Sequence, residues 1–178
     1  LALMHLHSAR MPARQDGSGG LLLLEEQDRS LWDTKQIAIG LEYLARSAEG
    51  ATFSRFHAEA AIAAEHCLAP AFAQTRWERI VECYAMLERL APSPLHTLNR
   101  AVALAEWQGP EAALRLMREL APPPWLASSH LWSAVLADLH RRTGDEASAK
   151  QYRERALAGA PSGAVRSALE RRLGPAAS

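Results

Sequence analysis

The stretch "SSHLWSAVLADLHRRTGDEASAKQYRERALAGAP", residues 128–161, decides the fold. It contains two apolar-periodic segments that meet at Gly144, a residue suited to end a helix. Asp145 follows as a helix N-cap, and Pro161 stops the second segment. Where the two segments would face each other, the residues are small: Ala137, Ala149 and Ala156. The stretch therefore predicts two antiparallel helices packed closely together.

The same arrangement recurs upstream at a fixed interval. Helix-to-helix turns are expected at Thr75, Gly109 and Gly144, which are 34 and 35 residues apart. Each second helix is followed by a proline: Pro92, Pro122 and Pro161. This is the period of the tetratricopeptide (TPR) repeat, in which each hairpin buries its apolar edge on the next. We predict an all-α, right-handed TPR-like array of three helical hairpins, with residues 162–174 as a capping helix.

The first fifty residues have a different pattern. Residues 1–10, "LALMHLHSAR", are typical of the end of a helix, and residues 11–20 form a glycine-rich loop. The acidic stretch "LLLLEEQDRSLWD", residues 21–33, follows and includes a possible short strand at its leucines. Its last residue, Asp33, stands three positions before Gln36, as in a capping box. A further helix should therefore begin here.

The acidic stretch should join two parts of the molecule. We expect a helical N-terminal segment at residues 1–50 and the TPR-like domain at residues 51–178. Asp28, Arg29 and Trp32 would lie at the hinge between them, with Arg29 paired to an acid and the indole filling the joint. The chain opens on leucine inside an amphipathic pattern, so we expect a fragment of a longer protein.

Composition excludes several classes of protein. The chain has 178 residues, 48% of them hydrophobic, and a formal net charge of zero, so neither disorder nor general nucleic-acid binding is indicated. Charge is uneven: residues 25–88 carry eleven acids and six bases, and residues 141–178 carry eight bases and four acids. The cysteines, Cys67 and Cys83, form no disulfide or zinc pattern and favour a reduced, cytoplasmic setting. No apolar run is long enough for a membrane span.

Catalytic patterns are missing from the sequence. It contains no nucleophile motif, no phosphate-binding glycine loop and no histidine or cysteine spacing typical of zinc. The acids of the stretch 21–33 could in principle transfer protons, but no base or pocket accompanies them. We therefore expect no enzyme, no catalytic residue, no bound metal and no cofactor.

An ordered series of segments resembles a known family. The series runs "LALMHLHSAR", "LLLLEEQDRSLWD", "IAIGLEYLARS", "HAEAAIAAEH", "TRWERIVECYAMLERLAPSPLHTLNRAVALAEWQGPEAAL" and "ADLHRRTGDEASAKQYRERAL". It is similar to the C-terminal extension of a large group of extracytoplasmic-function (ECF) bacterial sigma factors. The resemblance implies a part in transcription initiation, with sigma-factor core domains and RNA polymerase as partners in the full-length protein. Those domains are not in this chain, so direct DNA binding by it is not expected.

The first hypothesis is a regulatory, protein-binding domain. The first helices of such an array line a concave surface. Polar residues on these helices are candidate partner contacts, above all a polar pair in a helix of Ala, Val and Leu: Asn99 and Arg100, beside His57, Glu65 and His130. For each, an ordinary exposed or capping role is the alternative. Residues 121–129, with three consecutive prolines, depart from the family pattern.

The second hypothesis is a small-molecule sensor that controls the same sigma factor. Its pocket would lie between residues 1–50 and the array, lined by Asp28, Arg29 and Trp32. A deep apolar pocket there would support it, and a solidly packed joint would count against it. The acidic cluster alone does not distinguish the two hypotheses.

Overall fold

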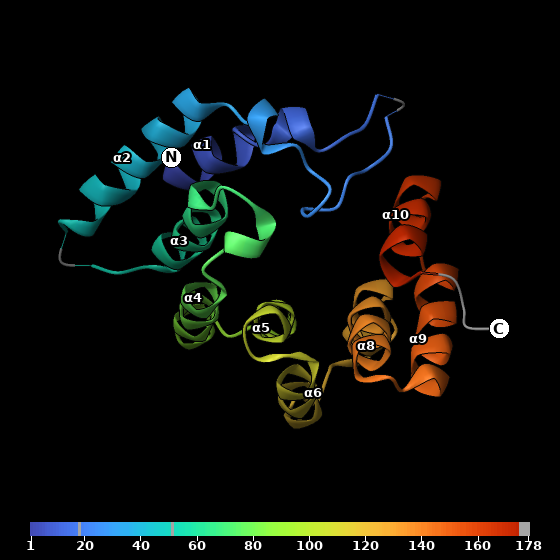
Figure 1. Ribbon diagram of the computed structural model, residues 1–178. Helices are drawn as coiled ribbons and strands as arrows, with labels where there is room; N and C mark the ends of the chain where they lie inside the picture. Colours follow the sequence, from blue (N-terminus) through green and yellow to red (C-terminus); the bar gives the residue numbers. More distant parts are fainter. Residues whose placement is uncertain (18, 51, 175–178) are drawn as a thin grey trace. The chain divides into compact units, whose positions relative to one another are not determined.

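The computed structural model describes residues 1–17, 19–50 and 52–174, and these residues are predominantly helical (Figure 1). The predicted all-α class is confirmed. Within the described ranges the β structure is one isolated antiparallel bridge between Gln15 and Leu21, so the leucine run forms no strand. The chain divides into two compact units, Leu1–Pro92 and Ser93–Ser178. The predicted boundary between residues 50 and 51 falls inside the first unit.

Over residues 1–17, 19–50 and 52–92, the first unit contains four α-helices and three short 3-10 helices. They are α1 (Ala2–Ser8), η1 (Met11–Ala13), η2 (Arg29–Leu31), α2 (Thr34–Ala48), α3 (Arg55–Leu68), η3 (Phe72–Gln74) and α4 (Trp77–Leu90). Helix α3 packs against α1, α2 and α4. The N-terminal segment and the first predicted hairpin, α3 with α4, therefore share one compact unit.

Leu6 is the centre of packing between α1, α2 and α3. It is fully buried against Ala63 and Ala64 of α3 and packs on the apolar side of α2. A side chain at Gly40 of α2 would bring its Cβ within 2.8 Å of the Leu6 Cγ. The glycine thus allows α1 and α2 to approach closely, and a leucine in this position stabilises the unit by about 2 kcal/mol.

The observed starts of α2 and α4 differ in detail from the predicted ones. Asp33 does cap α2, because its Oδ1 accepts from the backbone N–H groups of Lys35 and Gln36. The Gln36 side chain does not complete a capping box but bonds His5 Nδ1 at 2.6 Å, which ties α2 to α1. Thr75, expected to begin the next helix, is buried, and α4 begins two residues later at Trp77.

In the described part of the second unit, residues 93–174, there are six helices. They are α5 (Pro94–Gln108), α6 (Pro110–Glu119), α7 (Pro124–Ala127), α8 (His130–Thr143), α9 (Glu146–Ala158) and α10 (Gly163–Leu173). Helices α5 and α6 form one hairpin and α8 and α9 another (Figure 1). The turn glycines Gly109 and Gly144 have φ values of +90° and +80°, which L-residues with side chains rarely adopt. Residues 121–129, which depart from the family pattern, contain the additional short helix α7.

Small residues hold the second unit together, as predicted. Ala137 and Ala149 are almost fully buried where α8 meets α9, and Ala156 is completely buried. Leu173 of α10 joins Ala137 and Ala156 in one apolar cluster. Helix α10 therefore covers the α8–α9 hairpin in the manner of the predicted capping helix.

Candidate functional site

Arg29 joins the acidic stretch to the end of α3. Its Nη1 donates to the main-chain oxygens of His66, at 2.6 Å, and Ala69, at 2.7 Å. These carbonyls belong to the C-terminal end of α3, where the helix dipole favours a cation. Arg29 therefore ties the acidic stretch to α3, and the partners shown for it are carbonyl groups and not the predicted acid.

Trp32 lies beside two guanidinium groups. The residue is 4% exposed, and the Arg29 Cζ lies 4.6 Å and the Arg10 Cζ 5.1 Å from its ring centroid. Cation–π attraction of this kind strengthens when the groups are withdrawn from water. The indole is therefore a buried packing residue held between the Arg10 and Arg29 side chains.

The same two arginines also affect the pKa of the His66 imidazole. Burial is the main cause that lowers its imidazole pKa to about 4, and the neighbouring Arg10 and Arg29 guanidinium groups lower it further. The ring also packs edge-on against Trp77, with centroids 5.5 Å apart. His66 is thus a neutral, structural histidine near neutral pH.

The acids of the stretch 21–33 act locally. Asp28 is exposed and caps η2, accepting from the Ser30 backbone N–H at 2.9 Å. Hydrogen bonding to Ser30, by its side chain first and its backbone second, lowers the pKa of the Asp28 carboxyl. Glu26 accepts from the Leu23 backbone N–H at 2.7 Å. These carboxylates shape the turn that presents Arg29 and Trp32.

Two predicted contact residues of α3 have structural partners. His57 Nδ1 accepts from the Ser54 backbone N–H at 3.0 Å, and its Nε2 lies 3.3 Å from the Ser47 carbonyl at the end of α2. Glu65 forms a two-point ion pair with Arg76, at 2.7 and 3.0 Å. His57 fixes the α2–α3 connection, and Glu65 fixes the segment that leads into α4.

An apolar groove lies next to His57 in the first unit. Its volume is about 560 Å³, and α1, α2 and α3 supply its walls. Several of its side chains are large, apolar and exposed, including Met4 at 71% and Phe56 at 57%. Exposed apolar side chains gathered around a groove are typical of interaction sites. Of the predicted contact residues, His57 lines this groove.

The predicted contact residues of the second unit do not form one cluster. Asn99, on α5, is exposed and lines an apolar cavity. Arg100 is partly buried on the same helix and does not line that cavity. His130 begins α8 and lies beside Gly159 at the end of α9. A Cβ added at Gly159 would be 3.4 Å from the His130 Cβ. Asn99 is therefore the one of these three residues that lines this cavity among the described residues.

That cavity lies among α5, α8 and α10 and has a volume of about 330 Å³. Its walls are mostly aliphatic, and one end carries charged groups. The lining residues are Leu95, Leu98, Asn99, Val102, Ala105, Leu131, Ala134, Val135, Asp138, Leu139, Arg142 and Arg172. A concave apolar space with a few polar groups is the usual form of a small-molecule site.

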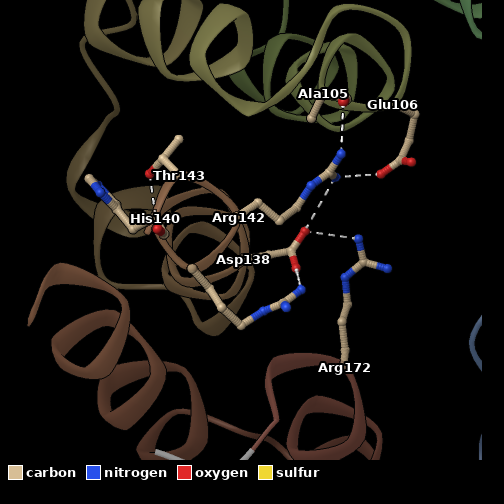
Figure 2. Close-up of polar contacts among 8 residues, drawn as sticks. Ala105, Glu106, Asp138, His140, Arg142, Thr143 and Arg172 are labelled. Atoms are coloured by element: carbon tan, nitrogen blue, oxygen red, sulfur yellow. Dashed lines mark hydrogen bonds and ion pairs between the residues drawn. The ribbon is translucent and has the colours of Figure 1, made fainter. Parts of the chain in front are cut away.

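Asp138 organises the charged end (Figure 2). Its carboxylate is 8% exposed and lies 2.7 Å from Arg141, 3.2 Å from Arg172 and 3.7 Å from Arg142. Arg142 also pairs with Glu106 at 2.6 Å and donates to the Ala105 carbonyl at 2.9 Å. The network therefore links α8 to α5 and to α10.

Asp138, Arg142 and Arg172 are not among the residues predicted from the sequence. A partial signal was present, because Asp138 stands four residues before Arg142 in one predicted helix, a spacing at which side chains pair. Arg172 is 34 residues from Asp138 in sequence and has no such signal. Only the packing of α10 brings it to the cavity.

Within residues 1–17, 19–50 and 52–174, no group of three or more histidine, cysteine or acidic side chains is arranged to hold a metal ion. In the same described ranges, no helix has the length and apolar character to cross a membrane.

The fold and these sites define an all-α protein built from helical hairpins. Residues 1–48, which include Arg10, Arg29 and Trp32, match a family of unknown function (DUF6596). The chain is similar to "Uncharacterized protein R00370" of Rhizobium meliloti (strain 1021), with 38% identity over 157 residues and 88% of this chain. The chain spans 37% of the length of that curated relative. No solved structure matches it.

Proposed function

We propose that the chain is a regulatory, protein-interaction domain of an ECF-type sigma factor and modulates transcription initiation by RNA polymerase in the cytoplasm. The resemblance of the ordered segments to the C-terminal extension of such factors supports this proposal. The length of the Rhizobium relative is consistent with it, since that protein is more than twice as long as the matched region. The partners in the proposal are the sigma-factor core domains, and through them the polymerase.

The observation that carries the proposal is the groove of the first unit. Met4 and Phe56 expose more than half of their surface beside it, although the same helices bury Leu6 and Ala58 completely. Withdrawal of such side chains from water stabilises an interface by about 25 cal/mol per Å² of apolar surface. A partner that inserts apolar side chains into the groove would therefore bind with specificity.

The test uses a longer protein that joins sigma-factor core domains to this chain. Transcription in vitro and binding to core RNA polymerase are measured with and without residues 1–178. We expect deletion to change transcription while polymerase binding is retained. The substitutions Met4→Glu and Phe56→Glu should reproduce much of this change, because a carboxylate in the groove opposes burial.

Trp125→Glu is the matched control, since Trp125 is 56% exposed on α7 and does not line the groove. It should leave transcription unchanged. Unchanged transcription after deletion of the whole chain would contradict the regulatory proposal. If transcription is unchanged in Met4→Glu and Phe56→Glu but changes when residues 1–178 are deleted, the interaction uses another surface of the chain.

The second candidate is a small-molecule-sensing domain that controls the same sigma factor. The cavity among α5, α8 and α10 favours it, although Asp28, Arg29 and Trp32 do not line that cavity. A ligand effect on transcription that is lost when this cavity is filled would support sensing. The same ligand effect in a cavity-filled variant would contradict it.

A further inference from the structure

The cavity of the second unit has a buried interior and an opening to solvent. On its inner side the wall is aliphatic and buried, with Leu98 and Ala105 of α5 and Leu139 of α8. Asn99 and Leu131 also line the cavity and are exposed, so they mark where it opens. A ligand that enters there places its apolar part against the buried aliphatic side chains.

The charged side chains on the wall have partners within the protein (Figure 2). Both Asp138 oxygens are engaged, with Oδ1 2.7 Å from Arg141 and Oδ2 3.2 Å from Arg172. Arg142 pairs with Glu106 at 2.6 Å. A charged ligand could form an ion pair here only in competition with one that the protein already has.

Asn99 supplies an uncharged polar group to the lining. In the part of the chain that the structure describes, its carboxamide forms no hydrogen bond with the protein. A carboxamide has an oxygen that accepts and an amino group that donates, so it can bond a hydroxyl, carbonyl or amide group of a ligand. The lining therefore offers a ligand a hydrogen bond from a neutral group.

The volume of the cavity limits the size of the ligand. A dry cavity of about 150 Å³ with an apolar lining binds benzene. The present cavity has a volume of about 330 Å³. It therefore holds a molecule roughly twice the size of benzene, which corresponds to about twelve non-hydrogen atoms.

We propose that this cavity binds an uncharged aliphatic molecule with one hydrogen-bonding group, whose chain lies between α5 and α8 and whose polar group bonds Asn99. A charged head group is disfavoured, because it loses hydration in the cavity and meets charges that are already paired. The inference deepens the sensing role given above as the second candidate by naming its ligand class. Direct binding tests it without a transcription measurement, so the failure of one does not decide the other.

The first experiment compares three straight-chain probes of equal carbon number: 1-octanol, octanoate and octylammonium. Binding to the full chain is measured by isothermal titration calorimetry. We expect 1-octanol to bind at least about tenfold more tightly than either ion, because only the ions lose the hydration of a charge. An ion that binds as tightly as 1-octanol would overturn the uncharged assignment. So would a lack of 1-octanol binding up to its solubility limit.

Chain length tests the size of the site. Affinity should rise about fourfold for each added methylene from 1-butanol to 1-octanol, since each methylene is withdrawn from water. It should level off between 1-decanol and 1-dodecanol, where the chain fills the cavity. A rise that continues through 1-dodecanol would show partition onto an open apolar surface and would overturn the cavity as the site.

A substitution at Asn99 tests the polar contact. Asn99→Leu should weaken 1-hexanol about fivefold, as the loss of one hydrogen bond predicts, and should not weaken 1-chlorohexane, which has no hydroxyl. Gln108→Leu is the matched control: Gln108 is exposed at the end of the same helix and does not line the cavity, so neither probe should change. An equal effect of Asn99→Leu on both probes would contradict the assigned role of Asn99.

Added rings test the location. Val102→Phe on α5 and Ala134→Phe on α8 fill the cavity from two walls and should each abolish 1-octanol binding. Ala147→Phe, at an exposed position of α9, and Ser47→Trp, in the groove of the first unit, should leave it intact. Circular dichroism checks folding, and either cavity variant suffices if the other fails to fold. Binding that survives in a folded cavity variant, or that is lost in folded Ser47→Trp, would overturn the location.

Discussion

At the scale of single residues, the first unit concentrates its polar interactions on the end of α3. Arg29 holds the carbonyl oxygens of His66 and Ala69, and the Trp32 ring lies against Arg29 and Arg10. A hydrogen bond from a charged donor to a buried carbonyl contributes about 1.5–3 kcal/mol. The two guanidinium groups add to the effect of burial, which is the main cause of the lowered pKa of the neighbouring His66.

From the lowered pKa of His66, we predict that the folded chain loses stability on mild acidification. Its pKa is lowered from 6.5 to about 4 in the folded chain, mainly by burial, so the unfolded chain takes up the proton first as pH falls. The stabilisation is present above pH 6.5 and is lost as pH falls toward 4. We expect the free energy of unfolding to drop by about 2 kcal/mol between pH 7.5 and 5.0 through this residue.

Urea denaturation at the two pH values measures this loss. His66→Asn should show a smaller drop than the wild type. Tyr84→Phe is the control: burial raises the Tyr84 pKa to about 12, so the phenol does not titrate in this window, and the drop should be unchanged. An equal drop in His66→Asn would show that the imidazole is not the group responsible.

At the scale of elements, glycine and alanine set how closely helices meet. Gly40 admits Leu6 between α1 and α2, and Ala137 and Ala156 let α8 and α9 pack together under Leu173. The turn between α8 and α9 depends on a left-handed residue, Gly144, which ends α8, and on Asp145, which caps α9 by accepting from the Ser148 N–H. Hairpin geometry in this protein is therefore a property of a few small residues.

Gly144 and Gly163 form a matched pair for substitution by alanine. Gly144 has a φ of +80°, so Gly144→Ala should destabilise the chain by about 1–2 kcal/mol although nothing would contact the added Cβ. Gly163 opens α10 and also has free space around it, so Gly163→Ala should be neutral or stabilising by up to about 1 kcal/mol. Chemical denaturation compares them, and equal effects of the two substitutions would contradict this assignment of strain.

At the scale of the whole molecule, the chain consists of two compact units. The second unit has its own apolar cluster, with Leu98, Met117, Leu126 and Leu139 at most 3% exposed. It also contains the complete Asp138 network, from Glu106 on α5 to Arg172 on α10. Both the cohesion of this unit and its cavity come from residues between Ser93 and Leu173.

We therefore expect residues 93–178 to fold as a separate chain. Circular dichroism should show helix, and thermal unfolding should be a single cooperative transition with a stability of about 4–13 kcal/mol at this length. Arg142→Ala in this fragment should remove about 3–5 kcal/mol, because Asp138 and Glu106 lose a shared partner away from water. A fragment that is helical but unfolds without cooperativity would contradict independent folding.

The sequence by itself determined the helical class, the three hairpins and most helix ends. Local signals encode these features: apolar periodicity, Asp33 and Asp145 as caps, Gly109 and Gly144 in turns, and alanines at close contacts. Tertiary structure decided the rest. The Gln36 side chain forms a hydrogen bond with His5 and does not cap the start of its own helix. Arg29 donates to carbonyl groups at the end of α3. Arg172 pairs with Asp138, which is 34 residues away in the sequence. These partners are distant in sequence, and only burial of the helices against one another brings them within hydrogen-bonding distance.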